Sequence, residues 1–431
     1  MAKKHNKPHL KKSKIDTPTE SSSSTSTSTT TIIEEKPDFE IDGSVLEGGG
    51  QILRNSIALA SLYNKCIEII NIRKGRDAPG LKAQHKTGID LMAKLYKAHL
   101  SGSKCGSTRV YYKPMVKEVN IQETIEADTK TAGSMCLLIQ VSLPCLLFSN
   151  GSSKMVLGGG TNADFAPSAD YMMRVFFPIA SRMGIDSTLT IDKRGFYPRG
   201  CGQMTMITKN LTEPLKPITM LEKGNVVKIT IQSYYTAKVS PLVAERMNNT
   251  AKKMFKKDGD FKKVDIETEM VDISKCSFGD GAFIFITAYT DTGCIYGATS
   301  NGSIGVPAEK VAEDATDIIL KDLQDGGCVD EYLQDQLIIF MALAKGKSEI
   351  KTGPISLHTQ TSILFTSKFT GAEFIITPCE NRKLGEETFI ITCNGIGYLP
   401  SSSITTTTTT TNSTLINNNN SNITTITTTA D

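Results

Sequence analysis

One histidine of this sequence has a setting suited to chemistry at phosphorus. Outside the first 36 residues the chain has three histidines, His85, His99 and His358. His358 lies in the stretch GPISLHTQTSILF, where a Gly-Pro turn leads into an expected helix and hydroxyl side chains flank the ring. A neutral imidazole is a competent nucleophile toward phosphorus. A lone histidine is more often structural, so the interpretation needs support from other segments.

A glycine-rich segment, DGSVLEGGGQILRNSIALA, offers a place for a phosphate. Its glycines free the backbone to approach a ligand closely. The helix that follows directs its unpaired N–H groups and positive dipole end toward an anion. Arg54, on the first turn of that helix, is placed to reach a phosphate, and Glu47, before the glycines, is placed to hold Mg²⁺. An ordinary glycine-rich helix entrance with a solvent-facing arginine fits the same residues.

A second segment, IRKGRDAPGLKAQHK, concentrates positive charge. It holds six basic residues, Arg73, Lys74, Arg76, Lys82, His85 and Lys86. The two arginines fall in a turn, and Gln84 and His85 fall on the first turns of the next expected helix. Because arginine forks match phosphate oxygens, the segment predicts a second anion site. A solvated basic face is the alternative.

Two further glycine-rich turns carry no recognised phosphate signature. GGGTNADFAPSADY (158–171) and RGFYPRGCGQ (194–203) match neither GxxxxGK[ST] nor a GxGxxG that follows a strand. The common mononucleotide-binding folds are therefore not supported. Asp335 and Gln336 lie on the expected helix before His358, which is unremarkable on its own.

These segments occupy matching places in three α/β units. Each unit has a helix, a strand, a small-residue turn with a proline in or near it, and a second helix, as expected where Pro and Gly mark helix entrances. The expected helix, strand and second helix are 51–63, 66–72 and 81–96, then 135–148, 153–159 and 169–184, then 330–344, 348–352 and 361–371. We predict a layered α/β fold of three repeated βαβαβ-type units, each with two helices on a four-stranded sheet.

The stretch 217–327 breaks this pattern and has the strands and helices of a complete small α/β domain, so we predict an insertion. The repeats then occupy 38–216 and 328–400. The ends, 1–37 and 401–431, include low-complexity tracts of Ser, Thr and Asn that cannot bury enough apolar surface to fold. We expect both tails to be disordered.

Composition narrows the class of protein. Residues 1–36 hold seven lysines against four acids and residues 401–431 hold one acid, so with +3 overall the body is close to neutral. Such a body is not a general nucleic-acid binder. Ten cysteines without a CxxC pair favour buried thiols over disulfides or zinc. No signal peptide is visible and the longest apolar run is too short for a bilayer, so we expect neither secretion nor membrane insertion.

Six motifs in order resemble the RNA 3′-terminal phosphate cyclase family. They are DGSVLEGGGQILR, RKGRDAPGLKAQH, TAGSMCLLIQVSLP, GGGTNADFAPSADY, RGFYPRGCGQM and LHTQT. The resemblance covers about 38–375 and implies three α/β repeats with a smaller inserted domain. Departures are few: Cys201 stands where the family usually has glycine, and Lys130 where a small residue is frequent.

The resemblance implies an ATP-dependent ligase that turns an RNA 3′-phosphate into a 2′,3′-cyclic phosphate. His358 would carry AMP and pass it to the RNA end as RNA-(3′)pp(5′)A. The partners would be ATP, a divalent metal (Mg or Mn) and RNA 3′-phosphate ends, with Glu47 and Asp335 as metal-contacting acids. Positions matched to phosphate or nucleotide contacts are Arg54, Arg73, Arg76, Gln84, His85, Gln140, Pro167, Asp335 and Gln336.

Three other functions share parts of this pattern. A cyclase-like ribosome-biogenesis factor would have the fold without the reaction, an RNA-end-binding module would keep the pocket without turnover, and an enolpyruvyl-transfer enzyme would share the repeated α/β units. His358 together with Arg54, Arg73 and Arg76 favours the cyclase. The basic segment KKHNKPHLKKSK suits nuclear import or nucleic-acid contact, and equally a solubilising tail. We expect a nuclear rather than a cytosolic protein and leave its oligomeric state open.

Overall fold

The computed structural model describes residues 34–379 and 387–400. The tails predicted to be disordered lie outside the described residues, except for their parts at 34–37, which form no helix or strand. Among the described helices, none is both long enough and apolar enough to span a membrane. All ten cysteines are unpaired thiols; six are buried, whereas Cys105, Cys201 and Cys276 are exposed against expectation.

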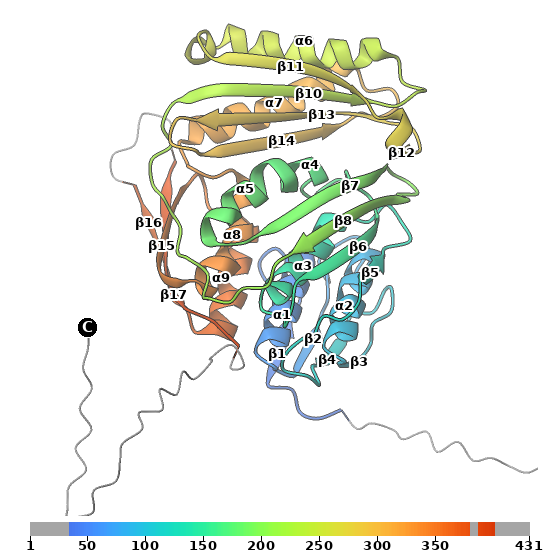
Figure 1. Cartoon of the computed structure of the whole chain (residues 1–431), viewed down its shortest axis with the longest axis vertical. Coiled ribbons are helices and arrows are strands. Elements are labelled where there is room, and N and C mark those ends of the chain that lie inside the picture. The colour runs from blue at the N-terminus through green and yellow to red at the C-terminus, as the bar shows by residue number, and fades with distance from the viewer. Residues whose placement is uncertain (1–33, 380–386, 401–431) are drawn as a thin grey trace, which may run out of the picture. The chain divides into compact units, whose positions relative to one another are not determined.

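Three repeats with the element order βαβαββ form the body (Figure 1). The first comprises β1 (Phe39–Asp42), α1 (Gly50–Leu62), β2 (Ile67–Ile70), α2 (Ala83–Leu95), β3 (His99–Ser101) and β4 (Val110–Lys113). The second comprises β5 (Ile125–Asp128), α3 (Met135–Leu147), β6 (Ser153–Gly159), α4 (Ala169–Tyr171), α5 (Phe177–Ala180), β7 (Ser187–Gly195) and β8 (Gly202–Thr208). The third comprises β9 (Thr219–Met220), α8 (Glu331–Leu343), β15 (Lys345–Thr352), α9 (Leu357–Thr370), β16 (Phe374–Pro378) and β17 (Phe389–Ile396).

The three sheets share one topology. Their orders are β1-β2-β4-β3, β5-β6-β8-β7 and β9-β15-β17-β16, with the first pair parallel and the other pairs antiparallel in each. The predicted layered α/β fold of three repeats is therefore confirmed. The second sheet gains a fifth strand, β12 (Ser277–Phe278), from the inserted segment.

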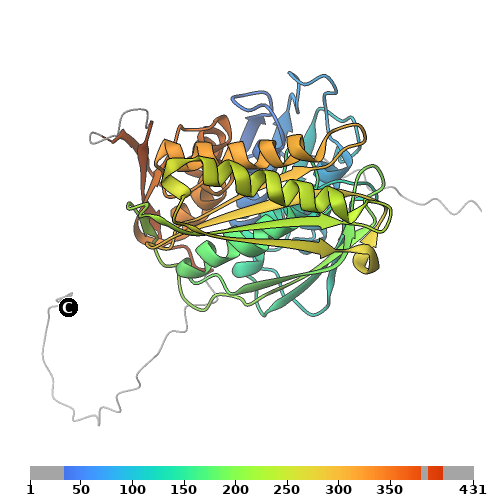
Figure 2. The same ribbon diagram turned by 90° about the horizontal axis from the view of Figure 1, so that it is seen from above.

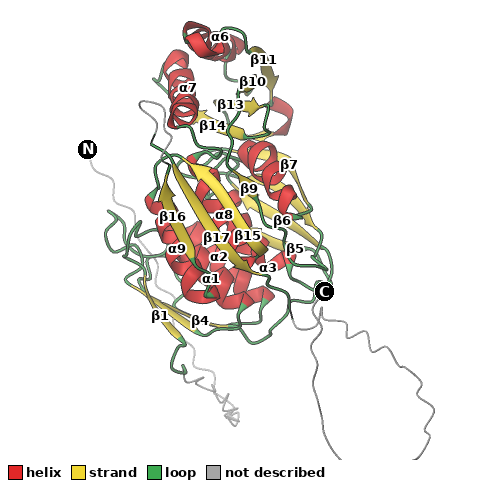
Figure 3. Ribbon diagram, turned by 90° about the vertical axis from the view of Figure 1, so that its left-hand side faces the viewer, coloured by secondary structure: helices red, strands yellow, loops and turns green. Residues whose placement is uncertain are grey.

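Helices fill the interior of the body and the three sheets lie outside them (Figures 1 and 3). The first helices of the repeats, α1, α3 and α8, are buried around almost their whole circumference. The sequence of α3, MCLLIQVSLPCLL, explains its burial because few of its residues are polar, whereas α8 also buries Gln334, Asp335 and Gln336. The second helix of the middle repeat is not one regular helix, because a π-helical turn, Met172–Phe176, separates α4 from α5.

The inserted segment enters between β9 and α8 of the third repeat. It contains β10 (Val226–Tyr235), α6 (Pro241–Lys257), β11 (Asp265–Asp272), β13 (Ala282–Thr290), β14 (Ile295–Asn301) and α7 (Ala308–Asp325). Its sheet has the order β11-β10-β13-β14, and α6 and α7 lie side by side on one face (Figures 2 and 3). Strand β9 lies within 217–327 but pairs with β15, and so completes the sheet of the third repeat.

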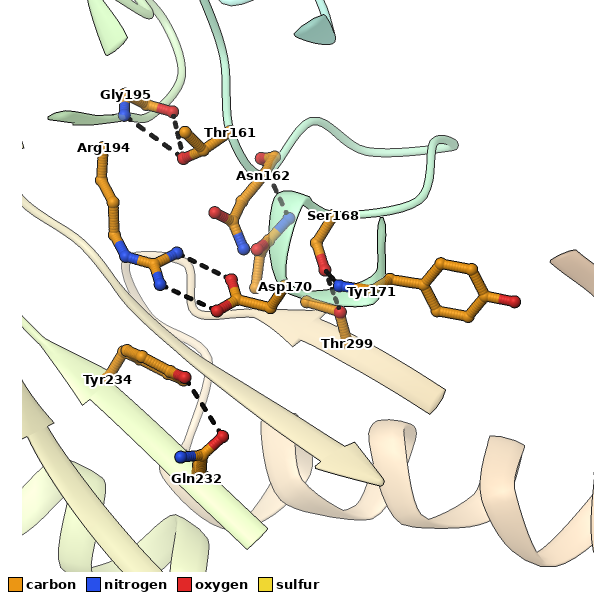
Figure 4. A network of polar contacts seen from close by, with 11 residues as sticks. Thr161, Asn162, Ser168, Asp170, Tyr171, Arg194, Gly195, Gln232, Tyr234 and Thr299 are labelled. Carbon is orange, nitrogen blue, oxygen red and sulfur yellow. Dashed lines mark hydrogen bonds and ion pairs between the residues drawn. The ribbon is translucent and has the colours of Figure 1, made fainter. Parts of the chain in front are cut away.

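A buried ion pair lies where the second repeat meets the inserted sheet (Figure 4). Arg194 of β7 donates two hydrogen bonds, 2.7 and 2.8 Å long, to the Asp170 carboxylate of α4. The guanidinium lies 4.7 Å from the ring centre of Tyr234 and 5.0 Å from that of Phe283. Because both charges are removed from water, the paired geometry and the two rings must offset a large desolvation cost.

Asp330, the N-cap of α8, connects three parts of the chain. Its carboxylate accepts a 2.8 Å hydrogen bond from the Leu333 amide, a 2.5 Å bond from the Tyr171 hydroxyl and a 3.0 Å bond from the Gly297 amide. These donors belong to the third repeat, the second repeat and the inserted domain. The start of α8 is therefore fixed by all three.

We predict that Asp330→Ala destabilises the protein by about 3 kcal/mol, because it removes a helix cap and leaves buried donors without an acceptor. Chemical unfolding monitored by circular dichroism measures this. The control is Asp314→Ala, which removes an exposed ion pair with Lys310 on α7 and should change stability by less than about 0.5 kcal/mol. Equal effects of the two substitutions would contradict the role of Asp330 in joining the three parts of the chain.

Candidate active site around His358

His358 is the second residue of α9 and is held there by the turn before it. The Ser356 side chain caps the helix by accepting a 3.1 Å hydrogen bond from the Thr359 amide. The side-chain oxygen of Gln334, on α8, accepts a 3.1 Å bond from the Ser356 amide and a 2.5 Å bond from the Thr359 hydroxyl. The first turn of α9 is thus fixed against α8, with its free N–H groups at the same end as His358.

The next turn of α9 ties His358 to the first repeat. Thr361 and Ser362, three and four residues on, share its helix face. The Thr361 hydroxyl accepts a 3.3 Å hydrogen bond from the Glu47 amide. The Ser362 hydroxyl accepts a 2.9 Å bond from the Asn55 side chain and donates a 3.3 Å bond to the carbonyl of Asp335. The sequence showed hydroxyl side chains beside His358, Thr361 among them, but it did not show that Thr361 and Ser362 join α9 to the first repeat.

Glu47 folds back over the glycines that precede α1. A side-chain carbon added at Gly49 would lie 1.8 Å from Oε1 of Glu47, so a larger residue there would displace the Glu47 carboxylate from this position. Arg76 donates hydrogen bonds to the carbonyl oxygen of Glu47, at 2.8 Å, and to Oε1, at 2.9 Å. Oε2 is buried and has no hydrogen-bond partner among the described residues. One carboxylate oxygen is therefore available to a ligand.

Arg54 and His85 meet at the start of α1. A carbon added at Gly50 would lie 2.7 Å from Nε2 of His85 and 2.9 Å from Nη1 of Arg54. Nδ1 of His85 accepts a 3.2 Å hydrogen bond from the Lys82 amide, which leaves Nε2 to carry the proton. Burial, then the charge of Arg54, lowers the His85 pKa to about 3, so the ring is neutral near pH 7. Arg54 also bonds Gln51, and its Nε is buried without a partner among the described atoms.

Arg73 stabilises its own turn. Its Nη1 donates to the carbonyl oxygens of Ala78 and Gly80, at 2.7 and 2.9 Å, and its backbone has a φ of +54°. The guanidinium is mostly buried, yet close enough to His85 for its charge to lower that pKa. Arg73 therefore contributes positive potential and shapes the turn that presents Arg76.

A small pocket lies between α1, α3 and α8. Its polar lining includes Gln51, Gln140, Asp335 and Gln336. The side-chain oxygen of Gln336 is buried without a hydrogen-bond partner in the described structure, while its nitrogen bonds the Tyr332 carbonyl at 2.6 Å. Burial raises the Asp335 pKa to about 7, and the charge of Arg54 opposes this rise. The pocket thus contains the carboxyl group of Asp335, which titrates near pH 7, and the side-chain amide of Gln336, whose oxygen lacks a hydrogen-bond partner in the described structure.

Tyr332 is an exposed aromatic residue near the candidate site that the sequence did not single out. It lies one turn before Asp335 and Gln336 on α8 and stays partly exposed. Its ring contacts the edge of Tyr171, with centroids 5.6 Å apart. An aromatic residue three positions before an expected ligand-binding acid was the signal available in the sequence.

Gln84 lies on the first turn of α2, and Pro167 lies on the loop between β6 and α4. The side-chain oxygen of Gln84 accepts a 3.1 Å hydrogen bond from the Ser134 amide, so it joins α2 to the start of α3. Pro167 is buried on the loop before α4, and the hydrogen bonds of that loop run to β7 and β14. Cys201, where the resemblance expects glycine, has a φ of +54°, a conformation that glycine adopts without strain.

His358 lies at the solvent-exposed edge of this cluster. Partial removal of water lowers the pKa of its imidazole, Arg54 and Arg76 lower it further, and Glu47 opposes them. The ring is therefore neutral and able to act as a nucleophile near pH 7. The starts of α1, α2 and α9 meet beside it, an arrangement that favours an anion.

No group of three or more His, Cys, Asp or Glu suited to a metal ion occurs in residues 34–379 and 387–400. Mg²⁺ is, however, usually bound by one or two carboxylates together with substrate phosphates rather than by a protein cage. The unpartnered Oε2 of Glu47, beside an anion site, fits that mode. Asp335 interacts electrostatically with both Glu47 and Arg54 and is a second acid within reach of the cluster.

Comparison with known proteins gives a consistent result. The family model described as RNA 3′-terminal phosphate cyclase matches residues 45–376. A "Probable RNA 3′-terminal phosphate cyclase" of Dictyostelium discoideum is 66% identical over 401 residues, covering 93% of this chain and 91% of its own length. Proteins called "RNA 3′-terminal phosphate cyclase" from Desulfurococcus amylolyticus and Drosophila melanogaster are 37% and 32% identical; both alignments cover 84% of this chain, and 99% and 97% of those proteins.

The raised pKa of Asp335 predicts a pH-dependent effect on stability. The carboxyl group of Asp335 has a pKa of 3.8 in the unfolded chain and about 7 in the folded protein. Between these two pH values the folded protein keeps a proton on Asp335 that the unfolded chain releases. The free energy of unfolding therefore falls as pH rises through this range. Asp335→Asn removes this penalty. We expect the melting temperature of the variant minus that of the wild type to increase from pH 5 to pH 8. A constant or decreasing difference would contradict a buried, protonated Asp335.

Proposed function

Because the chain belongs to the RNA 3′-terminal phosphate cyclase family, we propose that it uses ATP to convert RNA 3′-phosphate ends into 2′,3′-cyclic phosphates. The observation that carries the proposal is the placement of neutral His358 on the first turn of α9, beside the Glu47–Arg76 pair and Arg54. A nucleophile, cations and helix N-termini meet there, as phosphoryl transfer requires.

In the proposed first step an imidazole nitrogen attacks the α-phosphorus of ATP. A P–N bond forms, the bond to the bridging oxygen breaks, and pyrophosphate leaves. An oxygen of the RNA 3′-phosphate then attacks the same phosphorus, which releases the imidazole and joins RNA to AMP through a 3′–5′ pyrophosphate. Finally the neighbouring 2′-hydroxyl attacks the RNA phosphorus, loses its proton to solvent and displaces AMP.

The surrounding residues favour these transfers by position and charge. Arg54 and Arg76 neutralise charge on phosphate oxygens, and the neutral His85 offers its Nε2–H as a donor beside them. Glu47 would hold Mg²⁺ or Mn²⁺ with its free oxygen, and the metal would supply charge neutralisation at the phosphates. Gln140, Asp335 and Gln336 line the pocket that we assign to the nucleoside. Import by the basic N-terminal segment would make the protein nuclear.

We predict that His358→Asn abolishes self-adenylation. Wild-type protein incubated with α-labelled ATP and divalent metal, without RNA, should acquire an acid-labile, alkali-stable label, as a phosphoramidate does. The variant should lose labelling by on the order of 10⁴-fold or more, because the nucleophile is removed. Leu364→Ala, which removes an exposed side chain from the same helix outside the LHTQT motif, is the control and should keep the label. Folded wild-type protein without label would favour a ribosome-biogenesis or RNA-end-binding role.

The lowered pKa of His358 predicts the pH profile of this step. Since the neutral ring is the nucleophile and its pKa lies below the ordinary value of 6.5, adenylation should reach half its maximal rate below pH 6.5 and level off above it. Single-turnover labelling from pH 5 to pH 9 measures this. A rate that rises only above pH 8 would show that another group, or a protonated imidazole, controls the step.

A further inference from the structure

The loop 160–168 of the second repeat corresponds in topology to the two connections that build the candidate site. It joins β6 to α4, as residues 71–82 join β2 to α2 and residues 353–356 join β15 to α9. The first-repeat connection presents Arg76, and the third-repeat connection leads into His358. The second-repeat connection presents Phe165, whose role the proposed chemistry leaves open.

Phe165 has an unusual conformation for an aromatic residue. Its side chain is 100% exposed, and its φ of +58° lies in the left-handed region that bulky residues rarely adopt. Packing therefore does not explain why the position is aromatic. A strained residue that the surrounding structure holds in place is a reason to look for a function.

The loop that carries Phe165 is held firmly. The Thr161 amide donates a 3.0 Å hydrogen bond to the Gly195 carbonyl, and Asn301 donates a 3.0 Å bond to Asp164. Ser168 caps α4 and contacts the Thr299 hydroxyl at 2.8 Å (Figure 4). The exposed ring is thus presented by a rigid support.

A second exposed aromatic side chain lies on the connection bonded to this loop. Tyr197 follows Gly195 by two residues and is 84% exposed. Arg199, on the same turn, is exposed, and Lys130 is exposed on the neighbouring connection, whose Thr131 carbonyl packs against Gly200. Two aromatic rings and two cations therefore project from connections that touch one another.

These connections lie next to residues of the candidate site. Ser168 is the N-cap of α4, whose Tyr171 donates a hydrogen bond to Asp330 and contacts the ring of Tyr332. The Lys130 connection ends at Ser134, which bonds Gln84 next to His85. An RNA strand whose 3′ end reaches His358 would therefore pass close to the connections that carry Phe165, Tyr197 and Lys130.

Resting on the proposed function, we infer that Phe165 and Tyr197 are stacking platforms for unpaired bases of the RNA strand that precedes the terminal phosphate. Every base offers a π face, so such platforms bind single strands with little sequence preference, and nearby cations follow the backbone. This assigns a role to the two glycine-rich turns that match no phosphate-binding signature. The occupant is single-stranded RNA, because the faces of bases inside a duplex are already covered by the base pairs stacked above and below them.

The test measures binding of a fluorescently labelled single-stranded oligoribonucleotide with a 3′-phosphate by anisotropy. Phe165→Ala and Tyr197→Ala should each raise Kd about 5- to 10-fold, which is the lower end of the effect of one lost base–aromatic stack. Kd for a 3′-phosphorylated dinucleotide, too short to reach both platforms, should change less. Leu242→Ala, which removes an exposed apolar side chain from α6, is the matched control and should leave Kd unchanged.

A second pair of variants separates binding from folding. Phe165→Asn suits the left-handed backbone, so it should keep or raise the melting temperature while weakening RNA binding as much as Phe165→Ala. Phe165→Trp, which keeps an aromatic ring at this position, should bind RNA as tightly as the wild type. Labelling of His358 by ATP alone should be unchanged in all variants, which separates this inference from the proposed reaction. Kd values within twofold of wild type for both alanine variants would overturn the inference and point to another occupant, such as a protein.

Discussion

The placement of His358 depends on the hydrogen bonds of the first two turns of α9. Ser356 and Thr359 are held by Gln334, while Thr361 and Ser362 connect α9 to Glu47, Asn55 and the backbone of Asp335. These short polar side chains supply directional contacts between the first and third repeats near His358, in addition to the bond from the Tyr398 hydroxyl to the Leu62 carbonyl. The polar contacts set the rotation of α9, and this rotation aims the imidazole at the anion site.

The repeat explains why a site can form from distant segments. All three units have the connectivity βαβαββ, and their helices pack together inside the three sheets (Figure 1). Equivalent connections can then diverge while the scaffold stays the same. The first repeat supplies Glu47, Arg54 and Arg76, the third supplies Asp335 and His358, and the second, on our inference, contacts the RNA strand. The inserted domain replaces the short β-to-α connection of the third repeat.

Much of the fold could be predicted because its signals are local. Apolar helices such as α3 and α8, and glycine or proline at helix entrances, are visible in short windows of sequence. Strand β9 was not recognised, because its two residues form a strand only by pairing with β15, more than a hundred residues later. The π-helical turn after α4 was missed for a similar reason, since no composition signal distinguishes it from an ordinary helix. Arg73, one of the expected ligands, uses its Nη1 to bond the carbonyls of its own turn, a contact that residue type alone cannot reveal.

The central claim is that His358 becomes covalently linked to AMP. The most direct measurement is tandem mass spectrometry of peptides from the full-length protein after incubation with ATP and a divalent cation, under alkaline conditions that preserve a P–N bond. The account predicts an adenylyl group on His358 that disappears when RNA with a 3′-phosphate is added. A nucleotide attached to another residue, or a folded protein that stays unmodified, would contradict it.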